Sequence, residues 1–390
     1  MPKLGCPALE INYHSNMSPN PLKLFLFGTL LLIAGGCRKD EPTLPALPQT
    51  AIIVYMAADN NLEDYAKNNI NQMEQAVTRE DQTLLVYLNA SGEAPRVLKI
   101  VPDTGPEIVS PAVLTYSSQN AADPQVMKQV LEDIREAYPA TSYGLILWSH
   151  ATSWMPPGSR PTTLAFGDDQ GEQMDIRELK NALPGTYDYI VFDACSMASV
   201  EVVYELRTKT DYILASPTET IASGMPYHRV IPHFFEGHPG LQKVADKYVE
   251  YYQEQDGLYR SATMSLIDTR EMTALAAATK AVLEQAEFSD PDYHRSEVQR
   301  LDFDSPPATE GYDFLDFFVK NLPSEHFSAV RQQLEKTVLF KLHTSEFIGQ
   351  PIEAFCGLSC YIPHPGDELI NNYYRNLEWT QASGFHLLIR

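Results

Sequence analysis

Residues 187–203 change their hydrophobic period partway along, and this change strongly constrains the fold. Residues 188–192 form a short apolar run rich in Ile, Val and aromatic side chains, which predicts a buried strand that ends close to Cys195. From Ser196 onward the apolar residues recur at helical spacing, which predicts a helix directly after the cysteine. Sites in open α/β sheets form at the carboxyl ends of strands, and the amides that begin a helix favour a thiolate. Cys195 is therefore a candidate nucleophile, although a buried thiol packed under a helix would explain the same pattern.

A second apolar run, residues 143–149, predicts another buried strand, and His150 follows it directly. A single histidine at the end of a strand is more often structural than catalytic. If the two strands are parallel neighbours, however, His150 and Cys195 open onto the same edge of the sheet. The pair then meets the requirement for a nucleophilic cysteine and a general acid/base that act on one carbonyl group.

Strands alternate with helices through the first part of the folded region, which predicts an α/β fold. The expected strands cover residues 51–58, 83–90, 96–102, 143–149, 188–193 and 211–220, and the expected helices cover 61–77 and 124–138. This order predicts a three-layer αβα sandwich with a mostly parallel sheet. Because the chain becomes more helical after Gly257, we place a catalytic domain at 51–257 and a helical and mixed C-terminal region, packed on the core, at 258–390.

The first 37 residues have the features of an export signal. Residues 24–36 are apolar or small, follow Lys23 and are too few for a comfortable membrane span. The small residues before Cys37 resemble a bacterial lipoprotein processing site, in which Cys37 is lipidated, and Met17 would give the more conventional start. Residues 38–50 are charged and then proline-rich, as in a solvated tether, and their RKDE start resembles surface-export signals of Bacteroidetes lipoproteins. We expect an exported lipoprotein that is anchored to the outer membrane of a bacterium and faces either the periplasm or the cell surface.

Charge and cysteine content exclude two classes of protein. The net charge of -22 argues against a nucleic-acid partner, because a phosphate backbone needs a basic face. With Cys6 and Cys37 assigned to the leader, only Cys195, Cys356 and Cys360 remain, which is too few for a disulfide-stapled scaffold. The last two fit no familiar metal pattern and are expected to be packed thiols.

Five segments resemble, in the same order, segments of the clostripain family of caspase-like cysteine peptidases. They are IIVYMAADNNLEDYAKNNINQM, LILWSH, FDACSMASVEVVYELR, SPTETIASGMPY and GLSCYIP. The resemblance covers most of the chain after residue 50 and implies a caspase-like fold and peptidase activity. One position departs from the family pattern, since Ala151 stands where glycine usually follows the histidine. A positive φ at this position would strain alanine.

The resemblance and the chemistry together predict a mechanism and a specificity. Cys195 attacks the scissile carbonyl, His150 is the general acid/base, and the amides of Ala151 and Cys195 are offered as oxyanion donors. Asp193 shares a strand face with Cys195, and the resemblance implies that it meets the basic side chain before the scissile bond. We therefore expect protein or peptide substrates with basic residues, cleaved after Arg, with Lys second. A helix-capping carboxylate is the alternative for Asp193.

The loop after the strand at 211–220 is expected to border the same site, which makes Glu219, Thr220 and Ser223 candidate substrate contacts. Two other functions remain open. The first is a catalytically inactive surface binding lipoprotein on the same fold, which the departure at Ala151 favours. The second is a caspase-like or legumain-like peptidase with a preference for acidic residues or Asn, in which Asp193 would be purely structural.

The segment between the histidine and the cysteine is rich in carboxylates, but it does not match a calcium loop. Asp168, Asp169, Glu172 and Asp175 lack the EF-hand order of ligands, so an exposed acidic hairpin that leads into a helix is expected. The chemistry requires no cofactor, the family resemblance keeps calcium possible, and no metal ligand is assigned. Some family members are cut in this interval; Pro161 makes Arg160 a poor site and other basic residues lie in a predicted helix, so we expect processing not to be obligatory.

Overall fold

A computed structural model describes residues 50–79, 81–156, 166–288, 293–303 and 311–389 of the chain. The predicted leader, its lipidation site Cys37, most of the tether and Arg160 lie outside these residues. The described residues belong to one compact unit. None of the described helices is both long and apolar enough to cross a membrane.

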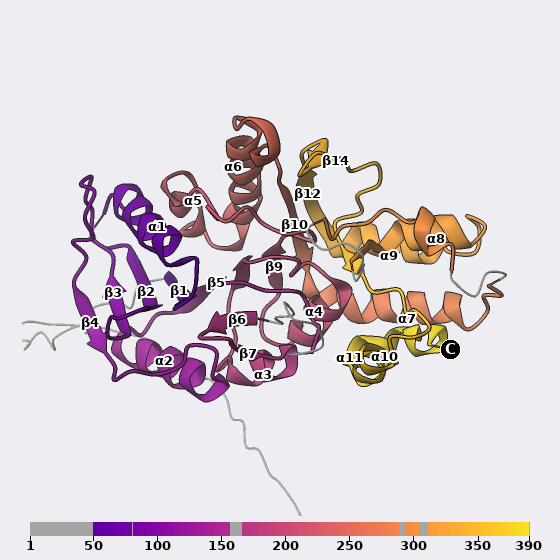
Figure 1. Cartoon of the computed structure of the whole chain (residues 1–390), viewed down its shortest axis with the longest axis horizontal. Coiled ribbons are helices and arrows are strands. Elements are labelled where there is room, and N and C mark those ends of the chain that lie inside the picture. Colours follow the sequence, from indigo (N-terminus) through magenta and orange to yellow (C-terminus); the bar gives the residue numbers. More distant parts are fainter. Residues whose placement is uncertain (1–49, 80, 157–165, 289–292, 304–310, 390) are drawn as a thin grey trace, which may run out of the picture. The chain divides into compact units, whose positions relative to one another are not determined.

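The central feature is a nine-stranded sheet in the order β12-β10-β9-β8-β5-β1-β2-β3-β4 (Figure 1). Its strands are β1 (Thr50–Ala58), β2 (Thr83–Ala90), β3 (Arg96–Lys99), β4 (Ala112–Thr115), β5 (Ser142–Trp148), β8 (Tyr189–Asp193), β9 (Tyr212–Ala215), β10 (Thr263–Asp268) and β12 (Val338–His343). The neighbours β9, β8, β5, β1 and β2 pair in parallel, whereas both edges of the sheet pair antiparallel. The predicted mostly parallel sheet is confirmed.

Helices cover both faces of the sheet, which gives the expected three layers. Alternate residues of β1 enter different cores, with Ile53 and Tyr55 on one face and Ile52 and Val54 on the other. The face of Ile52 packs against α1 (Glu63–Ala76), α5 (Tyr227–Phe234) and α6 (Leu241–Gln253), seen above the sheet in Figure 1. The opposite face shares one core cluster with α2 (Pro124–Ala137), α3 (Ile176–Ala182), α4 (Val200–Leu206) and α7 (Met272–Leu283). This cluster continues into α8 (Phe314–Asn321), α9 (Ser328–Thr337), α10 (Glu368–Tyr374) and α11 (Glu378–Ser383).

The region after Gly257 contributes to the same sheet. It supplies β10 and the edge strand β12, so the position chosen as a domain boundary runs through one continuous sheet. It also supplies α7 to α11, and its aromatic tail packs back on the core, where Trp379 and Phe385 are fully buried. The late segment GLSCYIP contributes only β15 (Ser359–Cys360), which pairs with β11 (Tyr312–Asp313) outside the central sheet.

Candidate active site

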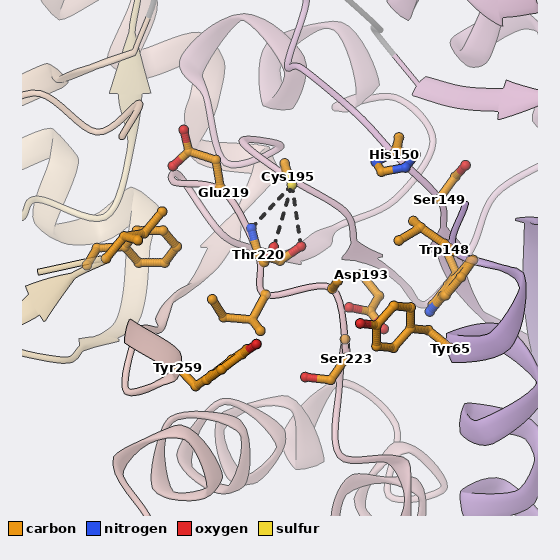
Figure 2. A pocket seen from close by; sticks show the side chains of 16 residues that line it. Tyr65, Trp148, Ser149, His150, Asp193, Cys195, Glu219, Thr220, Ser223 and Tyr259 are labelled. Atoms are coloured by element: carbon orange, nitrogen blue, oxygen red, sulfur yellow. Dashed lines mark hydrogen bonds between the residues drawn. The ribbon is translucent and has the colours of Figure 1, made fainter. Parts of the chain in front are cut away.

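His150 and Cys195 occupy matching positions beyond two adjacent strands. Strand β5 pairs in parallel with β8 and places Trp148 opposite Asp193, so the histidine and the cysteine each follow this pair by two residues. The predicted parallel neighbours are therefore confirmed. A cavity of about 410 Å³ is lined by both side chains and by every substrate-contact candidate, namely Asp193, Glu219, Thr220 and Ser223 (Figure 2).

The segment that follows Cys195 is a loop, so the prediction of a helix from Ser196 is wrong. Ser196 has a φ of 61°, a left-handed conformation that cannot begin a helix. Its N–H donates instead to the carbonyl of Thr218 at 2.7 Å, and α4 begins later, capped by the side chain of Ser199. The N–H of Ala198 likewise donates to the carbonyl of Ser216 in the same neighbouring loop. Since α4 begins only at Val200, Cys195 does not lie at the start of this helix, and Asp193 does not cap it.

Thr220 surrounds the sulfur of Cys195 with polar groups. The Thr220 N–H donates to Sγ at 3.3 Å, and its Oγ1 lies 3.6 Å from Sγ, as the dashed lines in Figure 2 show. The loop that carries Thr220 is held by buried hydroxyl groups, since Thr263 Oγ1 lies 2.6 Å from Ser216 Oγ and 2.8 Å from Thr218 Oγ1. Cys195 Sγ also lies 3.9 Å from the carbonyl oxygen of Thr220, so this loop holds the position of the sulfur.

His150 is oriented by a residue from a third loop. Its Nε2 lies 2.7 Å from Oδ1 of Asn61, which follows β1, the other neighbour of β5. Because an amide oxygen only accepts, this contact selects the tautomer with a proton on Nε2 and leaves Nδ1 able to take one. Burial lowers the pKa of His150, and the negative charge of Asp168 opposes this effect. The ring is therefore neutral near pH 7 and suited to act as a base.

From the sequence, the polar residues after the first strand, Asn61 among them, could be catalytic, but a capped helix start explains them adequately, so Asn61 is not among the predicted site residues. Asn60 makes the local bond instead, with its Oδ1 accepting from the N–H of Leu62 at 2.8 Å. The signal that could have identified Asn61 is its place just beyond a central strand, at the same sheet edge as His150 and Cys195.

Ala151 adopts an ordinary backbone conformation. It is buried, bridges Phe166 in an antiparallel pair, and is not among the residues with positive φ in the described ranges. Alanine in place of glycine therefore introduces no left-handed strain here.

Asp193 is a buried carboxylate in the cavity wall. Its Oδ2 accepts from the N–H of Met225 and from the hydroxyl of Tyr227, both at 2.9 Å. Burial raises the pKa of Asp193 to about 6, while these two hydrogen bonds oppose the rise. Gly224 lies against this carboxylate with a φ of 67°, and a Cβ there would lie 2.7 Å from Oδ2. Glycine at this position therefore permits the close approach of the loop to Asp193.

The other substrate-contact candidates also bond to the scaffold. Glu219 Oε1 accepts from the N–H of Phe303 at 2.7 Å, and Ser223 Oγ lies 3.0 Å from the hydroxyl of Tyr252. The sequence analysis missed several apolar and aromatic residues of the cavity, which are Leu62, Tyr65, Trp148, Ile221, Tyr259, Phe347 and Ile348. They come from five separate segments, so no local pattern joins them.

The acidic segment forms the expected hairpin, β6 (Phe166–Asp169) and β7 (Glu172–Met174), which leads into α3. Asp169 is fully buried, however, and accepts from Asn89 Nδ2 at 2.5 Å, so the expectation of an exposed hairpin is wrong for this residue. Asp168 accepts from a backbone amide of the turn, and Asp175 caps α3. Within the described ranges no three His, Cys, Asp or Glu side chains gather as possible metal ligands.

Cys356 and Cys360 are buried and are not bridged to each other. Burial raises the pKa of both thiols well above the ordinary value, so neither has the thiolate character of a nucleophile. The prediction of two packed thiols is confirmed.

A mostly parallel α/β sheet that brings a cysteine and a histidine together beyond adjacent strands defines a caspase-like cysteine peptidase. Comparison with known families agrees, since the model of the clostripain family matches residues 54–341. The chain belongs to the clostripain family of cysteine peptidases. A comparison with functionally curated proteins finds no match.

Solved structures of related peptidases share the fold. An inactive zymogen of a C11 protease from Parabacteroides distasonis is 30% identical, with a TM-score of 0.77 over 87% of this chain and 99% of that chain. A secreted C11 cysteine protease from Bacteroides thetaiotaomicron, in complex with an irreversible peptide inhibitor, is 30% identical, with a TM-score of 0.75 over 86% and 99%. A clostripain from the same species, bound to the peptide inhibitor BTN-VLTK-AOMK, is 27% identical, with a TM-score of 0.50 over 56% and 97%.

Proposed function

We propose that this cysteine peptidase is an exported endopeptidase that cleaves proteins or peptides after Arg, with Lys second, through a dyad of Cys195 and His150. The observation that carries the proposal is that the cysteine, the histidine and the buried carboxylate of Asp193 all line the same cavity. Nucleophile, general acid/base and a negative group for the substrate side chain then act on one peptide.

In acylation, the sulfur of Cys195 attacks the scissile carbonyl carbon as its proton passes to His150. The carbonyl oxygen becomes an oxyanion, for which the amides of Cys195 and Ala151 are the proposed donors. The tetrahedral intermediate collapses when the C–N bond breaks, and His150 gives its proton to the leaving amine. The acyl group remains on Cys195 as a thioester.

In deacylation, water replaces the departed amine. His150 removes a proton from this water as the oxygen of the water attacks the thioester carbonyl carbon. The C–S bond then breaks, the proton on His150 returns to the sulfur of Cys195, and the product leaves as a carboxylic acid that ionises in water. The contact with Asn61 keeps the same nitrogen of His150 available in both half-reactions. In this proposed mechanism only protein groups and water take part in the reaction. Measuring activity in the presence of a chelator, and again after adding calcium, tests whether calcium contributes.

Asp193 supports the basic preference. Its hydrogen bonds from Met225 and Tyr227 both fall on Oδ2, and the side chain lines the cavity. A guanidinium pairs with a carboxylate through a planar fork, whereas an ammonium acts as a point charge, which favours Arg over Lys. The clostripain inhibitor BTN-VLTK-AOMK ends its peptide in lysine, which agrees with a basic preference in that relative.

The two other functions have less support. An acidic substrate side chain would meet the like charge of Asp193, which disfavours a caspase-like preference. The inactive binding protein was motivated by Ala151, whose backbone carries no left-handed strain. For location, we propose a lipid anchor at Cys37 on the outer membrane, with the enzyme on the periplasmic or cell-surface side; the related protease from B. thetaiotaomicron is described as secreted.

The experiment that tests the proposal is turnover of fluorogenic peptide amides ending in Arg, Lys, Asp or Asn by residues 38–390. We expect Arg to be fastest, Cys195→Ala to abolish turnover, and Cys356→Ala, which removes a buried thiol outside the cavity, to retain it. A thiol-directed probe should label the wild type and Cys356→Ala but not Cys195→Ala. No turnover with any peptide, together with no labelling at Cys195, would make the binding protein the better assignment.

A further inference from the structure

One wall of the cavity is apolar and takes no part in the chemistry described above. It is formed by Tyr259, at the end of a short 3-10 helix (Gly257–Tyr259), and by Phe347 and Ile348 of the hairpin β13 (Glu346–Phe347) and β14 (Gln350–Pro351). Figure 2 shows Tyr259 and His150 on opposite sides of Thr220. Tyr259 is 67% exposed, so much of its ring is accessible from solvent where it lines the cavity.

Ile348 occupies this wall in a strained conformation. Its φ is 47° and that of Gly349 is 74°, so both central residues of the hairpin turn are left-handed. Turns of this kind favour Asn-Gly, and a β-branched residue at positive φ is a genuine outlier. The N–H of Ile348 donates to Ser261 Oγ at 2.8 Å, which helps to hold the conformation. Strain of this sort persists where the surroundings determine it, and it clusters at ligand sites.

The apolar wall is fixed relative to the nucleophile through a short series of contacts. Glu219, next to Thr220, accepts from the N–H of Phe303, and the ring of Phe303 stacks on Phe347 with centroids 5.3 Å apart. Leu301, Phe303, Phe347 and Ile352 form a small core of their own beneath Ile348. Since Thr220 also donates to Cys195 Sγ, the wall and the sulfur belong to one connected framework.

We infer that Ile348 and Tyr259 form an apolar subsite for a substrate side chain on the N-terminal side of the scissile bond. The inference rests on the proposed function and adds a second specificity element to the basic residue. Because His150 protonates the leaving amine, the C-terminal half of the substrate departs on the side of His150. The acyl half therefore extends across the opposite wall, where burial of an apolar side chain lowers the barrier for kcat/KM.

Four fluorogenic amides test the subsite in the mature protein. The parent is acyl-Gly-Gly-Gly-Arg, and each of the others carries one leucine in place of one glycine. We expect one leucine position to raise kcat/KM about tenfold over the parent, the range found for burial of a small apolar group in a pocket. Ile348→Asn should remove most of this ratio, and because Asn tolerates the left-handed conformation it should melt no lower than the wild type.

Tyr259→Ser is a second variant that should also reduce the leucine ratio, and it decides the matter if Ile348→Asn fails to fold. Leu339→Asn is the matched control, because Leu339 is an apolar residue of β12 that is 49% exposed and lies outside the cavity lining. It should keep the full ratio. Equal rates for the four peptides, or a ratio unchanged in both subsite variants, would overturn the subsite while Arg cleavage still supports the proposed function. No cleavage of any Arg peptide by the wild type would overturn both.

Discussion

The buried carboxylate of Asp193 makes the preference for arginine depend on pH in a way that can be separated from the chemistry. The pKa of Asp193 is raised by burial to about 6, so the group becomes neutral as the pH falls through 6. Citrulline has the shape of arginine without its charge. The ratio of kcat/KM for Arg and citrulline peptides therefore reports the charge of Asp193, while titration of His150 affects both substrates and cancels.

The size of the effect follows from the pKa. At pH 8 the carboxylate is almost fully ionised, whereas at pH 5, about one unit below its pKa, about one molecule in ten is ionised. We expect the Arg/citrulline ratio to fall about tenfold between these two values. Because kcat/KM reports the free enzyme, the lower pKa that a bound guanidinium would produce does not move the midpoint.

Two variants make the assay specific for Asp193. Asp193→Asn should flatten the pH dependence and hold the ratio low throughout. Tyr227→Phe removes a hydrogen bond that lowers the pKa of Asp193, so the midpoint should move to higher pH. A wild-type ratio that does not change with pH, or a pH dependence that survives in Asp193→Asn, would refute the assignment of Asp193 to the basic side chain.

Three further predictions concern groups around the site. Asn61→Ala should lower kcat about tenfold with a smaller change in KM and shift the pH profile of His150, whereas Asn68→Ala, on the exposed face of α1, should do neither in steady-state assays. Glu201 is buried against the hydroxyl of Tyr374 at 2.9 Å, and burial raises its pKa to about 7. The protonated Glu201 contributes its full stability below the pKa of the unfolded state, and this contribution of about 3 kcal/mol is lost as the pH rises through 7. Glu201→Gln should therefore stabilise the protein against urea at pH 8 but not at pH 4. Equal effects of the substitution at the two pH values would contradict this prediction. Removal of divalent ions with EDTA should leave Arg cleavage intact, and loss of activity that calcium restores would show the contrary.

The sequence by itself determined the central architecture. Continuous apolar runs at 143–149 and 188–192 identify strands buried on both faces, and the helices between strands require a parallel sheet. Parallel neighbours end at one edge, so the proximity of His150 and Cys195 follows from the order of elements alone. Asp193 and Cys195 both line the cavity, although β8 ends at Asp193 and strand alternation does not extend to Cys195.

Only the tertiary structure decided how the loops complete the site. Met197 lies at helical spacing and is fully buried, yet its segment is a loop, because periodicity reports burial and not which partner accepts each backbone N–H. Asn61 contacts His150, which lies 89 residues away in the sequence. Ile348 lies in a strained turn and lines the same cavity as Tyr259, which comes from a distant segment. Such contacts, like the raised pKa of Asp193, depend on packing between segments that are distant in sequence, which no local pattern records.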